Sequence, residues 1–250
     1  MRYQAELDLA ITAARNAGAF LADAIQQPRV VLKEEGRDIK LQADREAEAR
    51  ILEVLRDLPH PVLTEESGTH GAYGADVDAW IVDPLDGTLN FQRGAPVCAV
   101  SIALARGNEP LLGVIYDFNR DELFTGVVSE GAWLNGAPMR VSAVRERSRS
   151  ILSTGFPTNR SYSEESLLEF VRHAQRFKKL RLLGSAAIML AYVACGRYEA
   201  YAEDDIMFWD VAAGAALVRA AGGHVDLESS LRLEWGCRIR AAAHADLWAS

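Results

Sequence analysis

The sequence predicts an α/β protein whose N-terminal half is of the α+β type and whose C-terminal half is of the α/β type. Three observations support this class. Two segments with a helical spacing of apolar residues come first, a series of short apolar runs separated by turn residues follows, and strand-like and helix-like segments alternate after about residue 150. We place the boundary between the halves in a polar stretch, which gives residues 1–145 and 146–250.

Two helices are predicted in the first 60 residues. Apolar residues recur at spacings of three and four over residues 5–25, and the pattern stops before Pro28. A second helix is expected to begin near Asp44, a plausible N-cap, and to run to Leu58, where Pro59 follows.

The next segment predicts a mostly antiparallel sheet on which these helices pack. Its short β-rich runs are punctuated by glycine, asparagine and proline, which favour turns. The expected strands are 61–63, 79–82, 97–105, 111–118 and 123–128.

Strands and helices alternate in the predicted C-terminal half. Strands are expected at 151–154, 180–183 and 198–201, and helices at 163–177, 185–195 and 209–221. Two glycines, Gly222 and Gly223, close the last helix, and such alternation is typical of an α/β unit.

Composition excludes several classes of protein. The 250 residues carry 27 Lys and Arg against 35 Asp and Glu, a formal charge of −8, so we expect no nucleic-acid partner. No run approaches the roughly 18 uncharged apolar residues of a membrane helix, and the charged N-terminus is unlike a signal peptide. Three widely spaced cysteines predict reduced thiols. A cytoplasmic protein without membrane contact is expected.

The strongest local signal is WIVDPLDGTLNF at residues 80–91. An apolar strand delivers Asp83 and Asp86 at its end, three residues apart across a proline, so that both can bind one hard cation together with the carbonyl oxygen of Leu85. The amides of Gly87 and Thr88, at the start of the next helix, would form an anion site facing that cation. Phosphoryl chemistry needs this arrangement.

Each acidic cluster also has an ordinary explanation. Asp86-Gly87 alone is a common tight turn, and two adjacent glutamates, Glu65 and Glu66, are typical of a solvated loop. Asp210 stands where an acidic residue favours a helix N-terminus. Three such clusters, each at the end of an apolar run, nevertheless favour a shared site.

The chain resembles the inositol monophosphatase family, within the wider group of lithium-sensitive, magnesium-dependent phosphatases. Two motifs carry the resemblance: DPLDGTLNF at 83–91 and WDVAAGAALVRAAGG at 209–223, with the intervening elements in the expected order from about residue 33 onward. The resemblance implies a layered αβαβα architecture like that of the sugar phosphatases, and a homodimer.

The resemblance also implies a metal site and a phosphate site. Two or three Mg²⁺ ions would be held by the carboxylates and one carbonyl of Glu65, Asp83, Leu85, Asp86 and Asp210. The phosphate would lie on Gly87 and Thr88. Four carboxylates packed together without cations would repel one another, so a metal also makes physical sense here.

Catalytic roles follow from the same resemblance. Thr88 and Glu65 would orient the attacking water, with Asp44 and Lys33 just behind them. Asp44 could instead serve only as an N-cap, and Lys33 only as a solvated charge at a strand edge.

Substrate contacts are implied at both ends of the site. The residues expected to touch the substrate are Asp86, Gly87, Thr88, Gly184, Ser185, Ala186, Glu203 and Asp210. The amides that start the helix after Gly184 would face the substrate hydroxyls, and Glu203 would accept a hydrogen bond from one of them. Gly184 could also be only a helix-entry turn.

The resemblance implies a magnesium-dependent phosphomonoesterase for a small polyol or sugar monophosphate, with myo-inositol 1-phosphate as the default. Fructose 1,6-bisphosphate, histidinol phosphate and 3′-phosphoadenosine 5′-phosphate remain alternatives, and so does a regulatory binding protein that retains the fold. Asp204 and Asp205 bring two acids and no neighbouring base to the mouth of the site, which would disfavour a second phosphate, unless both are only solvated turn residues.

Overall fold

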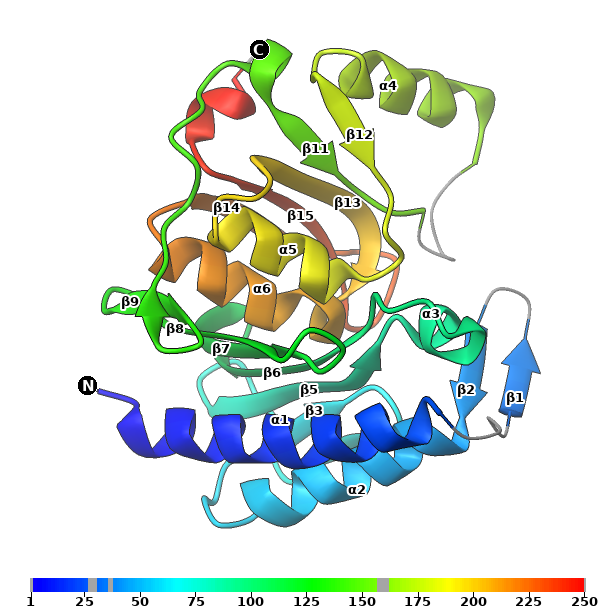
Figure 1. The fold of residues 1–250 in the computed structure, drawn as a ribbon, viewed down its shortest axis with the longest axis vertical. Coiled ribbons are helices and arrows are strands. Elements are labelled where there is room, and N and C mark those ends of the chain that lie inside the picture. Colours follow the sequence, from blue (N-terminus) through cyan, green and yellow to red (C-terminus); the bar gives the residue numbers. More distant parts are fainter. Residues whose placement is uncertain (1, 27–30, 36–37, 157–161, 250) are drawn as a thin grey trace.

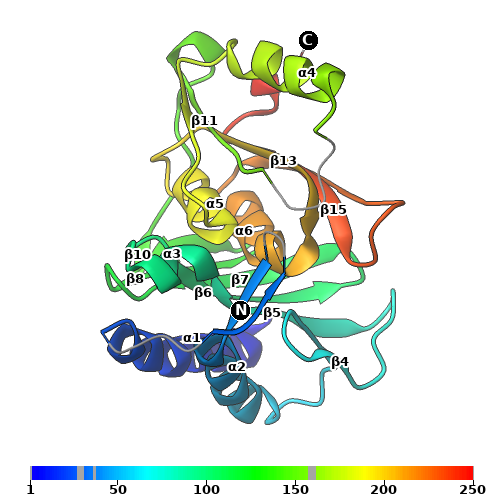
Figure 2. The same ribbon diagram turned by 90° about the vertical axis from the view of Figure 1, so that its right-hand side faces the viewer.

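Five layers of secondary structure are stacked in the computed structural model, which describes residues 2–26, 31–35, 38–156 and 162–249. From bottom to top in Figure 1 the layers are helices α1 and α2, an eight-stranded sheet, helices α5 and α6, a five-stranded sheet, and helix α4. Figure 2 shows the same order from the side. The predicted αβαβα class is confirmed.

The lowest layer consists of α1 (Gln4–Ala24) and α2 (Gln42–Leu55), packed against each other and against the large sheet. The small residues on one face of α1 are buried, which lets the helix lie close to the strands. The predicted N-cap at Asp44 was wrong. The helix begins two residues earlier, and the Asp44 carboxylate reaches back from the third helical position to accept the Leu41 amide at 2.6 Å.

The large sheet has the strand order β10-β9-β8-β7-β6-β5-β3-β4. Only the β3–β5 pair is parallel, so the predicted antiparallel character is confirmed. Its strands are β3 (Val62–Thr64), β4 (Gly68–His70), β5 (Asp78–Asp86), β6 (Ala99–Arg106), β7 (Glu109–Asp117), β8 (Glu122–Val127), β9 (Gly131–Leu134) and β10 (Ala137–Pro138).

The small sheet has the order β12-β11-β13-β15-β14, with β11 parallel to both of its neighbours and the other pairs antiparallel. Its strands are β11 (Ile151–Ser153), β12 (Lys179–Arg181), β13 (Ala200–Met207), β14 (His224–Ser229) and β15 (Gly236–Ala242). The remaining elements are α3 (Thr88–Arg93), α4 (Glu164–Ala174), α5 (Ala186–Ala194), α6 (Phe208–Ala220), the hairpin β1 (Val31–Glu35) and β2 (Asp38–Leu41), and two 3₁₀ turns, η1 (Arg147–Arg149) and η2 (Ala245–Leu247).

Helices α5 and α6 form the centre of the core because each faces a sheet on both sides. Most of their side chains are small or apolar and buried. Gly113 of β7 allows α6 to approach closely, since a Cβ atom there would lie 2.2 Å from the carbonyl oxygen of Ala213. This contact joins the large sheet to a helix of the C-terminal half.

Several elements were not predicted: the β1–β2 hairpin, β4, β9, β10, and the antiparallel pair β14–β15. All are short or carry charged residues on an exposed face, which weakens an apolar pattern. The cysteines are free thiols, as expected. Among the helices that the structure describes, none is both long and apolar enough to cross a membrane.

Candidate active site

The ends of two parallel strands bring Glu65 and Asp83 together. In the β3–β5 pair Thr64 lies opposite Val82, so the next residues, Glu65 and Asp83, are neighbours at the point where β3 ends and β5 continues. The Glu65 amide donates to the Val82 carbonyl at 3.2 Å and continues the ladder by one step. Glu65 was predicted as a ligand, and this register is the physical reason that it reaches Asp83.

A β-bulge explains how Asp86 can accompany Asp83. In the β5–β6 pair Asp83 lies opposite Ser101 and Asp86 opposite Ala99, so β5 carries one extra residue between the two acids. Without the bulge, residues three apart in a strand would point to opposite faces. The Asp83 carboxylate also accepts the Leu85 amide at 2.9 Å, which holds the turn closed.

Asp210 approaches from the C-terminal half, in the first turn of α6. Carboxylate oxygens of Glu65, Asp83 and Asp210 lie within 4.8 Å of one another. A set of carboxylate oxygens at this spacing fits a hard divalent cation such as Mg²⁺. The ends of β5 and the starts of α3, α5 and α6 lie together on the right of Figure 1.

The carboxylates of this cluster are unfavourable in their ionised form unless a positive charge lies near them. Burial raises the pKa of Asp83 and of Asp210 well above the usual range, and the charge of Glu65 raises both further. Burial also raises the pKa of Asp86 to about 6, although hydrogen bonds from the start of α5 oppose this rise. A bound cation would remove the repulsion that favours protonation.

Thr88 and Asp44 lie beside each other next to the cluster. The Thr88 hydroxyl is 3.1 Å from the Leu85 carbonyl oxygen and 3.3 Å from Asp44 Oδ1. Burial, with a smaller contribution from the charge of Glu66, raises the pKa of Asp44 to about 7. The structure thus brings Asp44 to Thr88. It describes the backbone of Lys33 in β1, but the Lys33 side chain lies outside the described part.

The start of α5 meets Asp86 from the other half of the chain. The Ser185 hydroxyl and the amides of Ala186 and Ala187, at 3.2 and 3.0 Å, all donate to the Asp86 carboxylate. The amides expected to face substrate hydroxyls are therefore directed at the Asp86 carboxylate, a contact that the sequence pattern did not predict. Gly184 adopts φ +76° just before this turn.

Glu203 is buried and held by a neighbour on its own strand. The Tyr201 hydroxyl donates to Glu203 Oε2 at 2.5 Å, because residues two apart in β13 share a face. The strand predicted at residues 198–201 stops short of Glu203, whereas β13 continues to Met207 and carries Glu203 on the same face as Tyr201. The negative charge of Glu203 also contributes to the raised pKa of Asp210.

The two acids after Glu203 are paired with arginines. Asp204 forms an ion pair of 2.9 Å with Arg240 of β15, and Asp205 forms one of 3.4 Å with Arg232. The expectation of a mouth without a base was therefore wrong: no basic residue is adjacent in sequence, but the strand that pairs with β13 supplies one. Asp205 has φ +56° at a bulge in that pairing.

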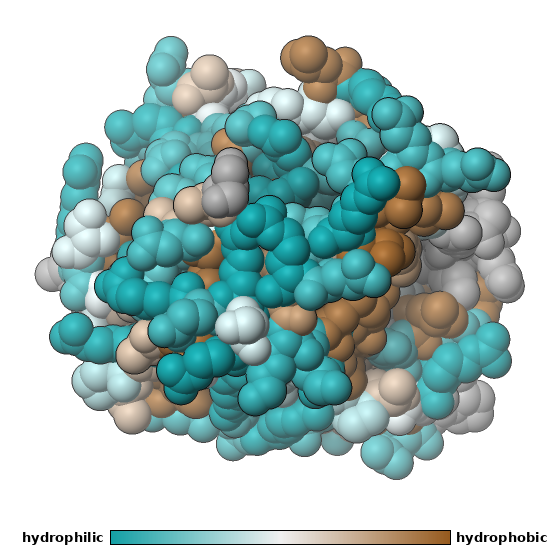
Figure 3. Space-filling view, turned by 90° about the horizontal axis from the view of Figure 1, so that it is seen from above, coloured by the Kyte–Doolittle hydropathy of each residue, from teal (hydrophilic) through white to brown (hydrophobic). Residues whose placement is uncertain are grey.

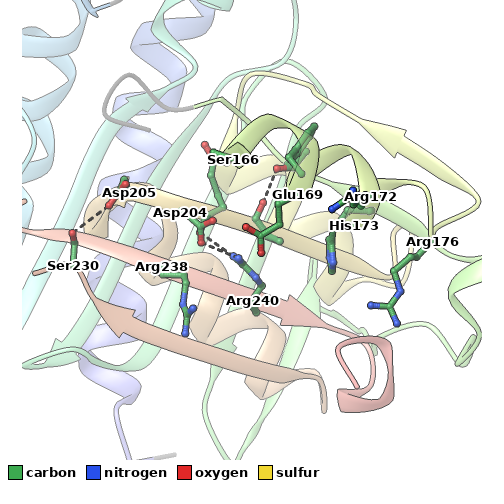
Figure 4. A pocket seen from close by; sticks show the side chains of 15 residues that line it. Ser166, Glu169, Arg172, His173, Arg176, Asp204, Asp205, Ser230, Arg238 and Arg240 are labelled. Atoms are coloured by element: carbon green, nitrogen blue, oxygen red, sulfur yellow. Dashed lines mark hydrogen bonds and ion pairs between the residues drawn. The ribbon is translucent and has the colours of Figure 1, made fainter. Parts of the chain in front are cut away.

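A cavity of about 590 Å³ opens between α4 and the outer face of the small sheet, and Figure 4 shows Arg240 pointing toward Asp204 inside it. Charges of both signs line this cavity: Glu169, Glu203, Asp204, Asp205, Arg172, Arg176, Arg238 and Arg240.

Comparison with known proteins matches this geometry to a family. The model of the inositol monophosphatase family matches residues 3–245. The chain belongs to the inositol monophosphatase family. Family membership confirms the resemblance drawn from the two motifs, and with it a metal-dependent phosphatase architecture.

Three relatives illustrate the range of the family. An inositol-1-monophosphatase of Synechocystis is 42% identical over 230 residues, covering 89% of this chain and 78% of the relative. The Nus factor SuhB of Haemophilus influenzae is 41% identical over 235 residues, covering 88% and 84%. The structure of an inositol monophosphatase from Anabaena superposes with a TM-score of 0.84 at 38% identity, covering 99% and 94% of the two chains.

Proposed function

We propose that this chain is a magnesium-dependent phosphomonoesterase that hydrolyses a small polyol or sugar monophosphate, with myo-inositol 1-phosphate as the first substrate to test. The observation that carries the proposal is the convergence of Glu65, Asp83 and Asp210 beside the Gly87–Thr88 turn. Asp86, whose charge raises the pKa of Asp83, and the carbonyl of Leu85, whose amide donates to Asp83, would complete the proposed ligand set.

Each group of the candidate site would have its own role in the reaction. Gly87 and Thr88 would receive the phosphate, while Glu65 and the Thr88 hydroxyl orient a water in line with the ester bond. Two or three Mg²⁺ ions held by the carboxylates would supply positive charge to the phosphate and make a nearby water more acidic. When the Thr88 hydroxyl donates to Asp44, its oxygen lone pairs are available to a water proton.

Substrate selection would take place on the side of the C-terminal half. We propose that Glu203 accepts a substrate hydroxyl and that the segment Gly184–Ala186 borders the same space. Lys33 keeps its proposed place behind the catalytic groups. Fructose 1,6-bisphosphate, histidinol phosphate and 3′-phosphoadenosine 5′-phosphate belong in the same test, because mixed charges line the neighbouring cavity.

The experiment is a panel assay of phosphate release from these four esters, with purified protein in the presence of Mg²⁺ and then of a chelator. Release from at least one ester that stops on chelation supports the proposal. No release from any ester in excess Mg²⁺ would contradict it.

A second candidate function is that of a regulatory binding protein, favoured by the name Nus factor that several relatives at 39–41% identity carry. Intact carboxylates and the Thr88–Asp44 contact favour an enzyme, but they do not prevent a second role. Protein that is inactive on the whole panel, yet binds a macromolecular partner, would reverse the order of the two proposals. A homodimer in the cytosol, without a nucleic-acid partner, remains our prediction.

A further inference from the structure

The side chain of Asn90 joins the two halves of the candidate site. Its Nδ2 atom donates to the carbonyl oxygens of Val97 and Leu183, each at 2.8 Å, and lies 3.2 Å from that of Gly184. Three carbonyl oxygens surround this one atom, so it must be the amide nitrogen rather than the oxygen. Asn90 belongs to α3, and its two distant partners come from the C-terminal half.

Close backbone contacts surround this side chain. A Cβ atom at Gly87 would lie 2.8 Å from the Val97 carbonyl oxygen and 3.2 Å from that of Gly184. A Cβ atom at Gly184 would lie 3.1 Å from Asn90 Nδ2. Both glycines have positive φ, +90° and +76°. The turn after Asp86 and the segment before α5 are therefore packed backbone against backbone, with the Asn90 amide between them.

The segment that Asn90 holds leads directly into the start of α5. Gly184 is followed by Ser185, whose hydroxyl donates to Asp86, as do the next two amides. Asp86 therefore binds the donors of this helix start, while Asn90 binds the carbonyls just before it. Asp86 and Asn90, which lie four residues apart, therefore both bind the segment at the start of α5.

We propose that Asn90 is a positioning residue for the phosphatase reaction. It fixes the start of α5 against the Gly87–Thr88 turn, so that a substrate whose phosphate lies at the turn meets Ser185 and Ala186 in a fixed register. This inference rests on the proposed function. Asn90 itself is directed at carbonyl oxygens and does not touch the substrate. A small displacement of positioned groups can cost a large factor in rate or binding.

The test compares Asn90→Asp with a matched control. An ionised aspartate has the shape of asparagine but no donor, and it would face three carbonyl oxygens. Asn16→Asp, at an exposed position on α1, makes the same change of charge away from the site. Asn90→Ala is a second variant that removes the donor without adding charge, in case the aspartate prevents folding. Each protein is examined by amide hydrogen exchange and by steady-state kinetics on myo-inositol 1-phosphate in excess Mg²⁺.

We expect about ten-fold or faster exchange at the amides of Ala186 and Ala187 in both Asn90 variants, with exchange in α6 unchanged, because two hydrogen bonds are lost. We expect KM to rise about ten-fold or more, with a smaller change in kcat and a half-saturating Mg²⁺ concentration within about two-fold of wild type. Asn16→Asp should match wild type in every measurement. A purely structural role would lower thermal stability without separating KM from kcat.

The outcomes separate this inference from the proposed function. An active wild type, with unchanged exchange and unchanged KM in both Asn90 variants, would overturn the role of Asn90. Faster exchange with an unchanged KM would overturn it as well, since α5 would then not position the substrate. A wild type inactive on every ester would overturn the proposed function, and the exchange data would still show whether Asn90 holds the start of α5.

Discussion

At the residue scale, burial and the close approach of several carboxylates raise their pKa values and favour the binding of a cation. Glu65, Asp83 and Asp210 lie within one small volume, and burial together with mutual repulsion raises the pKa of Asp83 and Asp210. Such a site favours a proton or a cation over empty, ionised carboxylates. Removing one negative charge should therefore affect metal binding and stability in opposite directions.

Replacing Asp83, Asp86 or Asp210 with asparagine should abolish activity, because each variant loses a charged ligand. Mg²⁺ affinity should fall by about ten-fold or more in each variant, while the metal-free protein becomes as stable as wild type or more so. Calorimetric titration with Mg²⁺ and urea unfolding in chelator measure the two effects. Unchanged affinity in all three variants would contradict the ligand assignment.

The stability of the metal-free protein should fall as pH rises. The pKa of Asp44 is raised to about 7 and that of Asp86 to about 6, from an ordinary value of about 3.8. The folded state therefore holds protons that the unfolded chain releases at lower pH, and this contribution is lost as pH rises through 6 and 7. Between pH 5.5 and 8 we expect these two groups together to lower the free energy of unfolding by about 3 kcal/mol in chelator.

Urea unfolding at the two pH values measures this change, and Asp44→Asn is the control because it removes the titrating group with the larger shift. The loss should be smaller in Asp44→Asn than in wild type. If the free energy of unfolding depends on pH equally in the wild type and in Asp44→Asn, the raised pKa of Asp44 is contradicted.

We predict that the ion pairs of Asp204 and Asp205 affect the choice between substrates. Replacing Asp204 with asparagine leaves Arg240 without its carboxylate, so the ratio of kcat/KM for fructose 1,6-bisphosphate to that for inositol 1-phosphate should rise, by roughly ten-fold or less. Arg240→Gln should lower the ratio. If neither substitution moves the ratio, the cavity has no part in selecting substrates.

The motif 83–91 predicted the acidic site because its spacing and residue types are local properties of the sequence. Its other contacts could not be predicted in this way. Asn90 is bound by carbonyls some 93 residues later, and Arg240 reaches Asp204 only because β15 pairs with β13. Partners that the fold brings from a distance leave no local pattern.

At the scale of elements, sequence patterns located helices better than exposed strands. Helix α1 was expected at 5–25 and observed at Gln4–Ala24, and α6 was expected at 209–221 and observed at Phe208–Ala220. In both helices apolar or small residues are continuous on the buried face. Strand β13, in contrast, continues through Glu203–Asp205, where charged residues and a bulge hide the pattern.

Close packing between β7 and α6 gives a direct test of the layered core. Gly113→Ala should destabilise the protein by about 2 kcal/mol or more, because the new methyl group would meet the Ala213 backbone. Gly74→Ala is the control, since the nearest atom there, Val77 Cγ2, lies 3.9 Å away. Equal urea midpoints for the two variants would contradict the observed approach of α6 to the sheet.

At the scale of the whole molecule, the site lies where the two sheets and the central helices meet. Asp83 and Asp86 come from the large sheet and Glu65 follows one of its strands, while Asp210 and the start of α5 come from the C-terminal half. Neither half contains the complete site. The proposed boundary at residue 145 therefore separates two segments of the chain, but the candidate site uses residues from both of them.

We predict that two copies of this chain form a homodimer. Seen from above, the end of the molecule that carries α4 is largely hydrophilic with an apolar strip on one side (Figure 3). Leu168 and Val171 of α4 are 50% and 45% exposed. Light scattering at micromolar concentration should give twice the chain mass of 27.4 kDa, and a monomer mass would contradict the dimer.

Phosphate release from myo-inositol 1-phosphate tests the central claim most directly, with wild-type protein and Asp210→Asn measured side by side in Mg²⁺ and in chelator. The wild type should release phosphate only with Mg²⁺, and the variant should lose that activity while remaining folded, because its carboxylate joins the C-terminal half to the metal cluster. Equal release by both proteins, or release that survives chelation, would contradict a metal-dependent phosphatase site at the carboxylate cluster.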